Sequence, residues 1–121
     1  MPDPQPISIN LQKKSRVLTI SYDDGAVFNL SCEFLRIYSP SAEVRGHGPG
    51  QEVLQTGKEN VMINEIEPVG NYAVKLVFDD GHDTGIYSWS YLYELGINHD
   101  KYWHDYLQAL ERAGYERKLN D

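Results

Sequence analysis

Two copies of one short pattern constrain the fold more than any other feature of the sequence. LTISYDDGAVFNL (residues 18–30) and VKLVFDDGHDTGIY (residues 74–87) each carry alternating apolar residues, an aromatic, Asp-Asp-Gly and a second apolar stretch. Asp-Gly between alternating runs is typical of a type I′ hairpin turn, in which both central residues have positive φ. We therefore predict two related β-hairpins, the first with Leu18, Ile20 and Tyr22 facing the core.

The second hairpin has its own alternation and a further strand before it. Val74, Leu76 and Phe78 alternate with their neighbours, and the strand after the turn is expected over Thr84–Trp89. The apolar residues of Val61–Ile66 predict another strand, separated from the hairpin by a turn that contains proline and glycine. The sequence thus predicts about five strands.

Each hairpin is followed by a short segment with the signals of a helix. SCEFLRIYS places Ser31 at an N-cap position, and SWSYLYELG places Ser88 or Ser90 there. Both segments contain leucine but are short. We expect one or two helical turns after each hairpin.

The C-terminal part predicts one longer amphipathic helix. From Asn98, the segment NHDKYWHDYLQALERAG carries Trp103, Leu107 and Leu110 at i, i+4 and i+7, which is one apolar stripe. Asn98 is the expected N-cap, and Gly114 fits a left-handed stop. The residues at both chain ends are polar and are expected to be frayed.

The connection between the two hairpins is the least regular part. Residues 39–60 are rich in glycine and proline in their first half, which predicts a long loop with room for a short strand around Val53–Leu54. The sum is an α+β fold: a small antiparallel β-sheet of two related hairpins plus an extra strand, with one C-terminal helix packed on it. We expect a single domain over residues 1–121, with its core at about 8–113.

Composition excludes several classes of protein. With 121 residues, of which 40% are hydrophobic, the chain is long enough for one core. The lone Cys32 cannot form an intramolecular disulfide and is expected to be buried as a small apolar group, which favours the cytoplasm. No apolar run approaches the roughly 18 residues that span a bilayer, so a membrane is not an expected partner. A net charge of −7 argues against nucleic acid.

His82 is the strongest candidate for a functional residue, because Asp79, Asp80 and Asp83 surround it in the sequence. It has two interpretations: a metal ligand or acid–base histidine, or a solvated residue of a surface turn, which we favour on spacing alone. The HDT segment lacks the acid that the His-x-Asp or His-x-Glu pair of an iron facial triad requires. His47, in RGHGPG, can complete a site with His82 only if its loop folds onto the turn.

Three linked segments carry a family resemblance. LTISYDDG, LRIYSPSAEVRGHGPG and VGNYAVKLVFDDGHDTGIYSWSYLYELG together resemble the gamma-butyrobetaine hydroxylase-like N-terminal domain family, over roughly residues 8–113. In the hydroxylases this domain precedes a 2-oxoglutarate- and iron(II)-dependent oxygenase domain. It binds structural zinc there through a Cys-x-Cys-x-x-Cys cluster and a later histidine. The matching positions here are Ser39, Ser41, Val44 and His82, so three of the four ligands are missing and the zinc is not expected.

The resemblance implies a stand-alone bacterial member that is not an enzyme, since the oxygenase domain is absent. We expect an accessory module that binds another protein and needs no cofactor. The expected surface combines the loop and the second hairpin, and consists of Arg36, Arg45, His47, Asp80, His82, Asp83, Tyr87 and Trp89. The alternative is a small metal-binding or redox-linked protein, in which His82, helped by His47 and by Asp80 or Asp83, holds zinc or iron.

Overall fold

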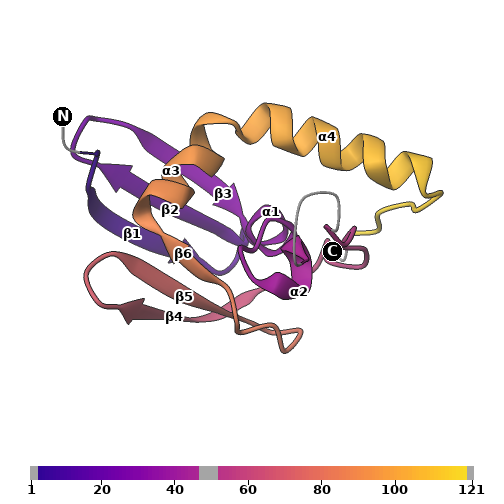
Figure 1. The fold of residues 1–121 in the computed structure, drawn as a ribbon, viewed down its shortest axis with the longest axis horizontal. Coiled ribbons are helices and arrows are strands. Elements are labelled where there is room, and N and C mark those ends of the chain that lie inside the picture. The colour runs from indigo at the N-terminus through magenta and orange to yellow at the C-terminus, as the bar shows by residue number, and fades with distance from the viewer. Residues whose placement is uncertain (1–2, 47–51, 120–121) are drawn as a thin grey trace.

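The computed structural model describes residues 3–46 and 52–119, which form two antiparallel sheets and four helices (Figure 1). The first sheet has the order β1-β2-β3 and the second β4-β5-β6. The strands are β1 (Pro6–Gln12), β2 (Val17–Tyr22), β3 (Val27–Ser31), β4 (Ile63–Val69), β5 (Ala73–Phe78) and β6 (Ile86–Ser88). The helices are α1 (Cys32–Ile37), α2 (Ala42–Arg45), α3 (Trp89–Ile97) and α4 (His99–Arg112).

The predicted α+β class is confirmed, with one difference in the sheets. The strand predicted before the second hairpin is β4, and the first hairpin also has a third strand, so the strands form two three-stranded sheets instead of one. The strand that the sequence analysis missed is β1, which begins at Pro6 in the segment expected to be frayed. Its apolar residues Ile7, Ile9 and Leu11 alternate, and this period of two was a usable signal.

The two Asp-Asp-Gly turns are confirmed as hairpins, but not as type I′ turns. Gly25 and Gly81 have φ of 92° and 91°, whereas none of the turn aspartates has positive φ. The Tyr22 N–H donates to the carbonyl of residue 26 and the Phe78 N–H to that of His82, both at 2.9 Å, so each loop has three residues. A type I turn followed by a left-handed glycine, the G1 bulge, has this geometry.

Loop length decides which face of the hairpin each residue occupies. Residues directly opposite one another on antiparallel strands share a face, and a shift of one residue reverses it. A two-residue loop would pair His82 with the exposed Asp79, whereas the three-residue loop pairs it with the buried Phe78. The next hydrogen bond runs from the Leu76 N–H to the carbonyl of Gly85, so Asp83 and Thr84 lie outside the ladder. Strand β6 therefore begins only at residue 86.

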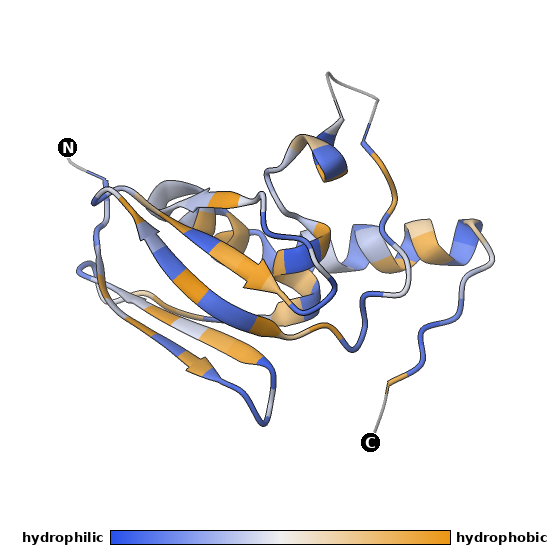
Figure 2. Ribbon diagram, turned by 90° about the horizontal axis from the view of Figure 1, so that it is seen from below, coloured by the Kyte–Doolittle hydropathy of each residue, from blue (hydrophilic) through white to orange (hydrophobic). Residues whose placement is uncertain are grey.

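The main core lies between the sheets and the helices α1 and α3. The predicted core residues of β2 are confirmed, since Leu18, Ile20 and Tyr22 are at most 1% exposed. Figure 2 shows the alternating hydrophobic and polar residues along the strands. Cys32 is fully buried among apolar residues, as expected. Both N-cap predictions hold, since the side chains of Ser31 and Ser88 accept hydrogen bonds from the first turns of α1 and α3.

The C-terminal helix α4 is confirmed, but its buried stripe differs from the prediction. Tyr106 and Leu110 are buried against Ile37 of α1, with Trp103 packed beside them. Leu107 is 37% exposed, so its place in the predicted stripe was wrong. Figure 1 shows that α4 continues from α3 beyond the sheets, on the side where α1 lies. The face of α4 that carries Tyr106 and Leu110 packs there against Ile37 of α1.

The remaining differences concern the connection and the C-terminal tail. Within the predicted loop, the chain forms α2, and residues 53–54 belong to no strand of the described structure. The tail after α4, expected to be frayed, is tied to the domain. The Tyr115 hydroxyl and the Lys118 N–H donate to Glu59, and the Arg117 guanidinium pairs with the buried carboxylate of Glu33. No helix among the described residues is long and apolar enough to cross a membrane.

Candidate functional site

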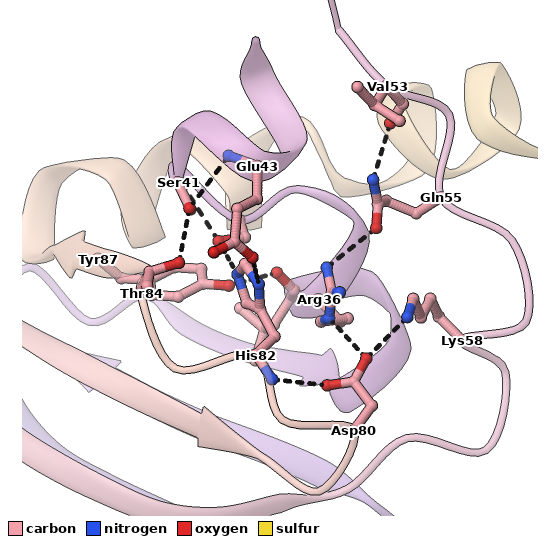
Figure 3. A network of polar contacts seen from close by, with 12 residues as sticks. Arg36, Ser41, Glu43, Val53, Gln55, Lys58, Asp80, His82, Thr84 and Tyr87 are labelled. Carbon is pink, nitrogen blue, oxygen red and sulfur yellow. Dashed lines mark hydrogen bonds and ion pairs between the residues drawn. The ribbon is translucent and has the colours of Figure 1, made fainter.

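Two segments that are far apart in the sequence meet at the candidate site (Figure 3). One segment runs from α1 into α2, and the other is the loop between β5 and β6. Ser39 and Ser41, from the first segment, contact His82 and Thr84 of the second. Val44 is also buried and lies one turn further along α2.

His82 lies at the centre of this contact, so the interpretation as a solvated surface residue is wrong. Its side chain is 1% exposed, because the three-residue loop places it on the inner face beside Phe78. Its Nδ1 is 3.0 Å from Oε2 of Glu43, and its Nε2 is 2.8 Å from Oγ of Ser39. A carboxylate only accepts hydrogen bonds, so Nδ1 carries the hydrogen and Nε2 accepts from the Ser39 hydroxyl.

The surroundings of His82 favour its neutral form. Burial lowers the pKa of His82, and the positive charge of Arg36 lowers it further, while Glu43 and Asp80 act in the opposite direction. A neutral imidazole can have one donor and one acceptor nitrogen, which matches its two partners. His82 is therefore a satisfied buried histidine in this arrangement.

A second group of polar contacts lies beside His82 and is centred on Asp80 (Figure 3). Asp80 Oδ2 accepts from Nε of Arg36 at 2.9 Å and from Nζ of Lys58 at 2.8 Å, and Oδ1 accepts from the His82 N–H at 3.1 Å. Partial burial raises the pKa of Asp80, but these hydrogen bonds and the Arg36 charge outweigh it and lower the pKa to about 2. Arg36 also donates to the side-chain oxygen of Gln55. The ion pairs thus tie α1 to both the β5–β6 loop and the segment before β4.

The order Ser39–His82–Glu43 is that of a nucleophile, a base and an orienting carboxylate in hydrolases. Accessibility argues against this activity. Ser39 is 0% exposed and the imidazole is 1% exposed, so a substrate carbonyl cannot reach Oγ without rearrangement of the fold. The Tyr87 hydroxyl, also buried, donates to the Leu35 carbonyl at 2.5 Å and helps to close the site. The arrangement is suited to joining two segments.

The residues that match the zinc ligands of the hydroxylases in the resemblance do not suit the metal. Ser39 and Ser41 supply hydroxyls and Val44 supplies only methyl groups, whereas structural zinc takes four thiolate or imidazole ligands. The two hydroxyls are engaged, since Oγ of Ser41 lies 2.7 Å from Oγ1 of Thr84 and Oγ of Ser39 bonds His82. Within residues 3–46 and 52–119, no group of three or more His, Cys, Asp or Glu side chains could hold a metal ion.

The predicted interaction surface is only partly exposed. Arg45 and Asp83 are exposed, and Trp89 is half-buried. Arg36 and Tyr87 are buried, as is His82, so these three cannot form part of a contact surface and their assignment to it is corrected. They were misassigned because they lie in the loop and the hairpin whose residues were all expected to be accessible. The other histidine of the predictions, His47, lies outside the described residues.

Several residues of the site were not predicted from the sequence. Glu43, Lys58, Gln55 and Thr84 enter through contacts between segments, and no local pattern links them to His82. Ser39 and Ser41 were identified only as positions of lost zinc ligands. The available signal was that two of these positions are serines and that His82 matches the fourth ligand. Hydroxyls and an imidazole at one site could have suggested hydrogen bonds in place of metal ligation.

An open hollow of about 250 Å³ lies next to this network, between α1, α2 and α4. We call it the α2 hollow. Ile37, Val44 and Tyr106 supply buried apolar or aromatic surface to it. Val53 and Leu54, which also line it, are 54% and 40% exposed. The hollow is thus the place where apolar side chains remain accessible beside the candidate site.

Comparison with known proteins identifies relatives of established structure. Two structures determined in solution by NMR are similar: one shares 57% identity and covers 98% of this chain and 89% of its own, and the other shares 49% and covers 98% and 93%. Both have a TM-score of 0.82. A crystal structure of a protein of unknown function from Acidithiobacillus ferrooxidans ATCC 23270, which belongs to the DUF971 family, shares 41% identity with a TM-score of 0.67. It covers 78% of this chain and 98% of its own.

No curated protein matches the sequence significantly. The family model described as gamma-butyrobetaine hydroxylase-like, N-terminal, matches residues 9–93, which is more than half of the chain. The order of the two hairpins and the position of His82 fall within that match. The chain therefore belongs to the gamma-butyrobetaine hydroxylase-like N-terminal family, as its resemblance predicted.

Proposed function

We propose that the chain is a non-catalytic module that binds another protein through the α2 hollow. The observation that supports this is the distribution of accessible groups. The side chains able to do chemistry, Ser39 and His82, are buried and paired with each other, whereas the apolar hollow beside them is open. A site that keeps its reactive groups inside and its apolar groups accessible is suited to binding.

The composition of the hollow agrees with a protein partner. Its surface combines exposed aliphatic residues, Val53 and Leu54, with the aromatic ring of Tyr106 and the exposed Arg45. Aromatic residues are enriched at the centres of protein interfaces, whereas the rim is polar, as are Arg45, Glu52 and Asp105 of the lining. We expect the partner to insert an aliphatic or aromatic side chain into the hollow, with Arg45 at its rim.

The network beside the hollow has a supporting role in this proposal. Arg36 donates to Gln55, and the carbonyl of Gln55 accepts from the Tyr106 hydroxyl at 2.7 Å. The Val53 N–H donates to the carbonyl of Val44 at 2.8 Å. These contacts hold the segment with the exposed apolar residues against α2 and α4. A preformed surface loses less conformational freedom on binding, which favours affinity.

The alternative, a metal-binding or redox-linked protein, has less support. Both ring nitrogens of His82 have hydrogen-bond partners, and Asp80 is engaged by Arg36 and Lys58. Asp83 is exposed and free to approach an ion, but a single carboxylate would have to recruit His82 away from two partners. We therefore do not assign zinc or iron to this chain.

Substitution of one exposed leucine tests the proposal. The immobilised chain is used to capture partners from a lysate of the source cells, and the captured protein is purified and titrated by calorimetry. Leu54→Asp is expected to weaken its binding about tenfold or more, which corresponds to about 1.4 kcal/mol. Ile86→Asp is the matched control, because Ile86 is 48% exposed on β6 and does not line the hollow. Equal affinity of the wild type and Leu54→Asp would contradict the proposal.

A further inference from the structure

The outer edge of β1 is the least protected edge of either sheet. Its sequence, PISINLQ, contains no charged residue, and its one proline stands at the first position, outside Ser8–Gln12. By contrast, β4, which is an outer strand of the second sheet, carries Glu65, Glu67 and Pro68, which are residues that prevent pairing at an edge. The edge strand β6 has only three residues, and β3 is in contact with α3. An uncharged edge strand of seven residues is a template for a further strand.

The backbone groups that this edge presents follow from the pairing of β2. The Tyr22 N–H donates to residue 26, so Tyr22, and by alternation Ile20, bond toward β3. The alternate residues of β2 therefore bond toward β1, and Thr19 pairs there with Asn10. It follows that the N–H and C=O groups of Ile9 and Leu11 point away from β2. Within the described chain, no backbone hydrogen bond joins these two residues to another segment on that side of β1.

The charges at the two ends of β1 have opposite signs. Asp3 lies before the strand, and Asp23 is held beside the same end because its N–H donates to the carbonyl of Gln5 at 2.8 Å. Lys13 and Lys14 follow the strand directly and are exposed. If a second copy of β1 lies antiparallel to the first, the cationic end of each strand lies beside the anionic end of the other. This complementarity favours a two-fold symmetric pair over a parallel one.

From these observations we infer that the edge of β1 pairs antiparallel with β1 of a second copy of this chain, which continues the three-stranded sheet into one of six strands. A register shift between Pro6 and Ser8 makes Ser8–Gln12 the regular part of the strand, so the pairing is centred on Asn10. Because the contact is short and mostly backbone, the dimer is weak and reversible. The inference does not depend on the α2 hollow or its partner.

One substitution with a matched control tests the inference in the full chain. Asn10→Lys puts two lysines next to each other across the two-fold axis, on an exposed position of β1. Asn64→Lys makes the same change at an exposed position of β4. Sedimentation equilibrium from micromolar to millimolar protein is expected to show a monomer–dimer equilibrium in which Asn10→Lys raises Kd about tenfold, whereas Asn64→Lys leaves it unchanged.

Two more measurements identify the contact. Amide hydrogen exchange of Ile9 and Leu11 is expected to slow as the protein concentration rises. The double variant Lys13→Glu/Lys14→Glu is expected to raise Kd, and adding Asp3→Lys is expected to restore part of the loss. A chain that stays monomeric at all concentrations, or a dimer that Asn10→Lys does not weaken, would overturn the inference. So would concentration-independent exchange at Ile9 and Leu11.

Discussion

Replacing His82 by alanine is the most direct test of the buried network. The substitution removes an imidazole whose side chain is 1% exposed and leaves the Ser39 hydroxyl without its acceptor. Truncating a buried phenylalanine costs about 3–5 kcal/mol, and the smaller imidazole should cost less. A buried hydroxyl whose hydrogen loses its acceptor adds about 1–3 kcal/mol, and the Ser41 N–H cannot replace that acceptor because it only donates to Oγ. We expect a total loss of about 2–4 kcal/mol in the free energy of unfolding.

Urea unfolding followed by tryptophan fluorescence measures this loss, because Trp89 and Trp103 both pack against the core. Asp83→Ala is the matched control: it changes the next residue, which is exposed and outside the network, and should stay within about 0.5 kcal/mol of wild type. In thermal unfolding, the alanine variant of His82 should lower Tm by about 10 °C or more. A loss for His82→Ala no greater than that for Asp83→Ala would refute the reasoning.

The same residue should make stability depend on pH. Burial lowers the pKa of His82 in the folded protein, so the unfolded chain takes up the proton at a higher pH than the folded chain does. The contribution of His82 is then fully present above about pH 6.5 and is lost as the pH falls through the folded pKa. Because His82→Gln cannot titrate, the advantage of wild type over this variant should shrink between pH 7 and pH 5. An advantage that grows in this range would show that His82 is charged when folded.

Three further predictions concern metal, packing and the tail. A strong chelator should leave Tm of the wild type unchanged. The triple variant Ser39→Cys/Ser41→Cys/Val44→Cys places cysteines at the positions that match the hydroxylases' ligands. It should bind zinc together with His82, as measured by metal analysis after dialysis. Leu110→Ala should cost about 2–5 kcal/mol in urea unfolding and Leu107→Ala less than about 1 kcal/mol, and equal losses would contradict the packing of α4. Arg117→Ala leaves the 6% exposed Glu33 without its ion-pair partner and should cost about 3 kcal/mol, and recovery of stability in the double variant with Glu33→Gln would confirm the cause.

Local signals predicted the parts of the fold that depend on neighbours in the chain. The alternation around Ile20 and Leu76 indicated the buried faces of two hairpins, and the serines at 31 and 88 marked helix starts. These features rest on residues within a few positions of one another. The site depended instead on whether the loop at Gly81 had two residues or three, because that difference alone decides whether His82 faces water or the core. Asp-Asp-Gly is compatible with both loops, so the sequence pattern did not separate them.

Long-range contacts account for the other misses. The apolar residues of α4 permit several stripes, and only the position of Ile37 on α1 selects the one that contains Tyr106 and excludes Leu107. The tail is polar and has no periodic pattern, yet Arg117 reaches a carboxylate 84 residues away. The composition of the tail predicts a solvated segment. Its partners, Glu33 and Glu59, can be recognised only when the positions of α1 and of the segment before β4 are known.

The network connects the same two segments that a structural zinc at the positions matching the hydroxylases' ligands would connect. A structural zinc would tie residues 39–44 to residue 82, and so does the arrangement here, through Ser39 and Glu43 on the two nitrogens of His82. Each such hydrogen bond contributes only about 0.5–1.5 kcal/mol, far less than a zinc site, so the two cannot replace it alone. Further contacts stabilise the same region. Asp80 forms ion pairs with Arg36 and Lys58, and Arg117 of the tail pairs with Glu33 of α1. Several moderate contacts thus connect these segments, and the segment that lines the α2 hollow is held to α1 by the hydrogen bond from Arg36 to Gln55.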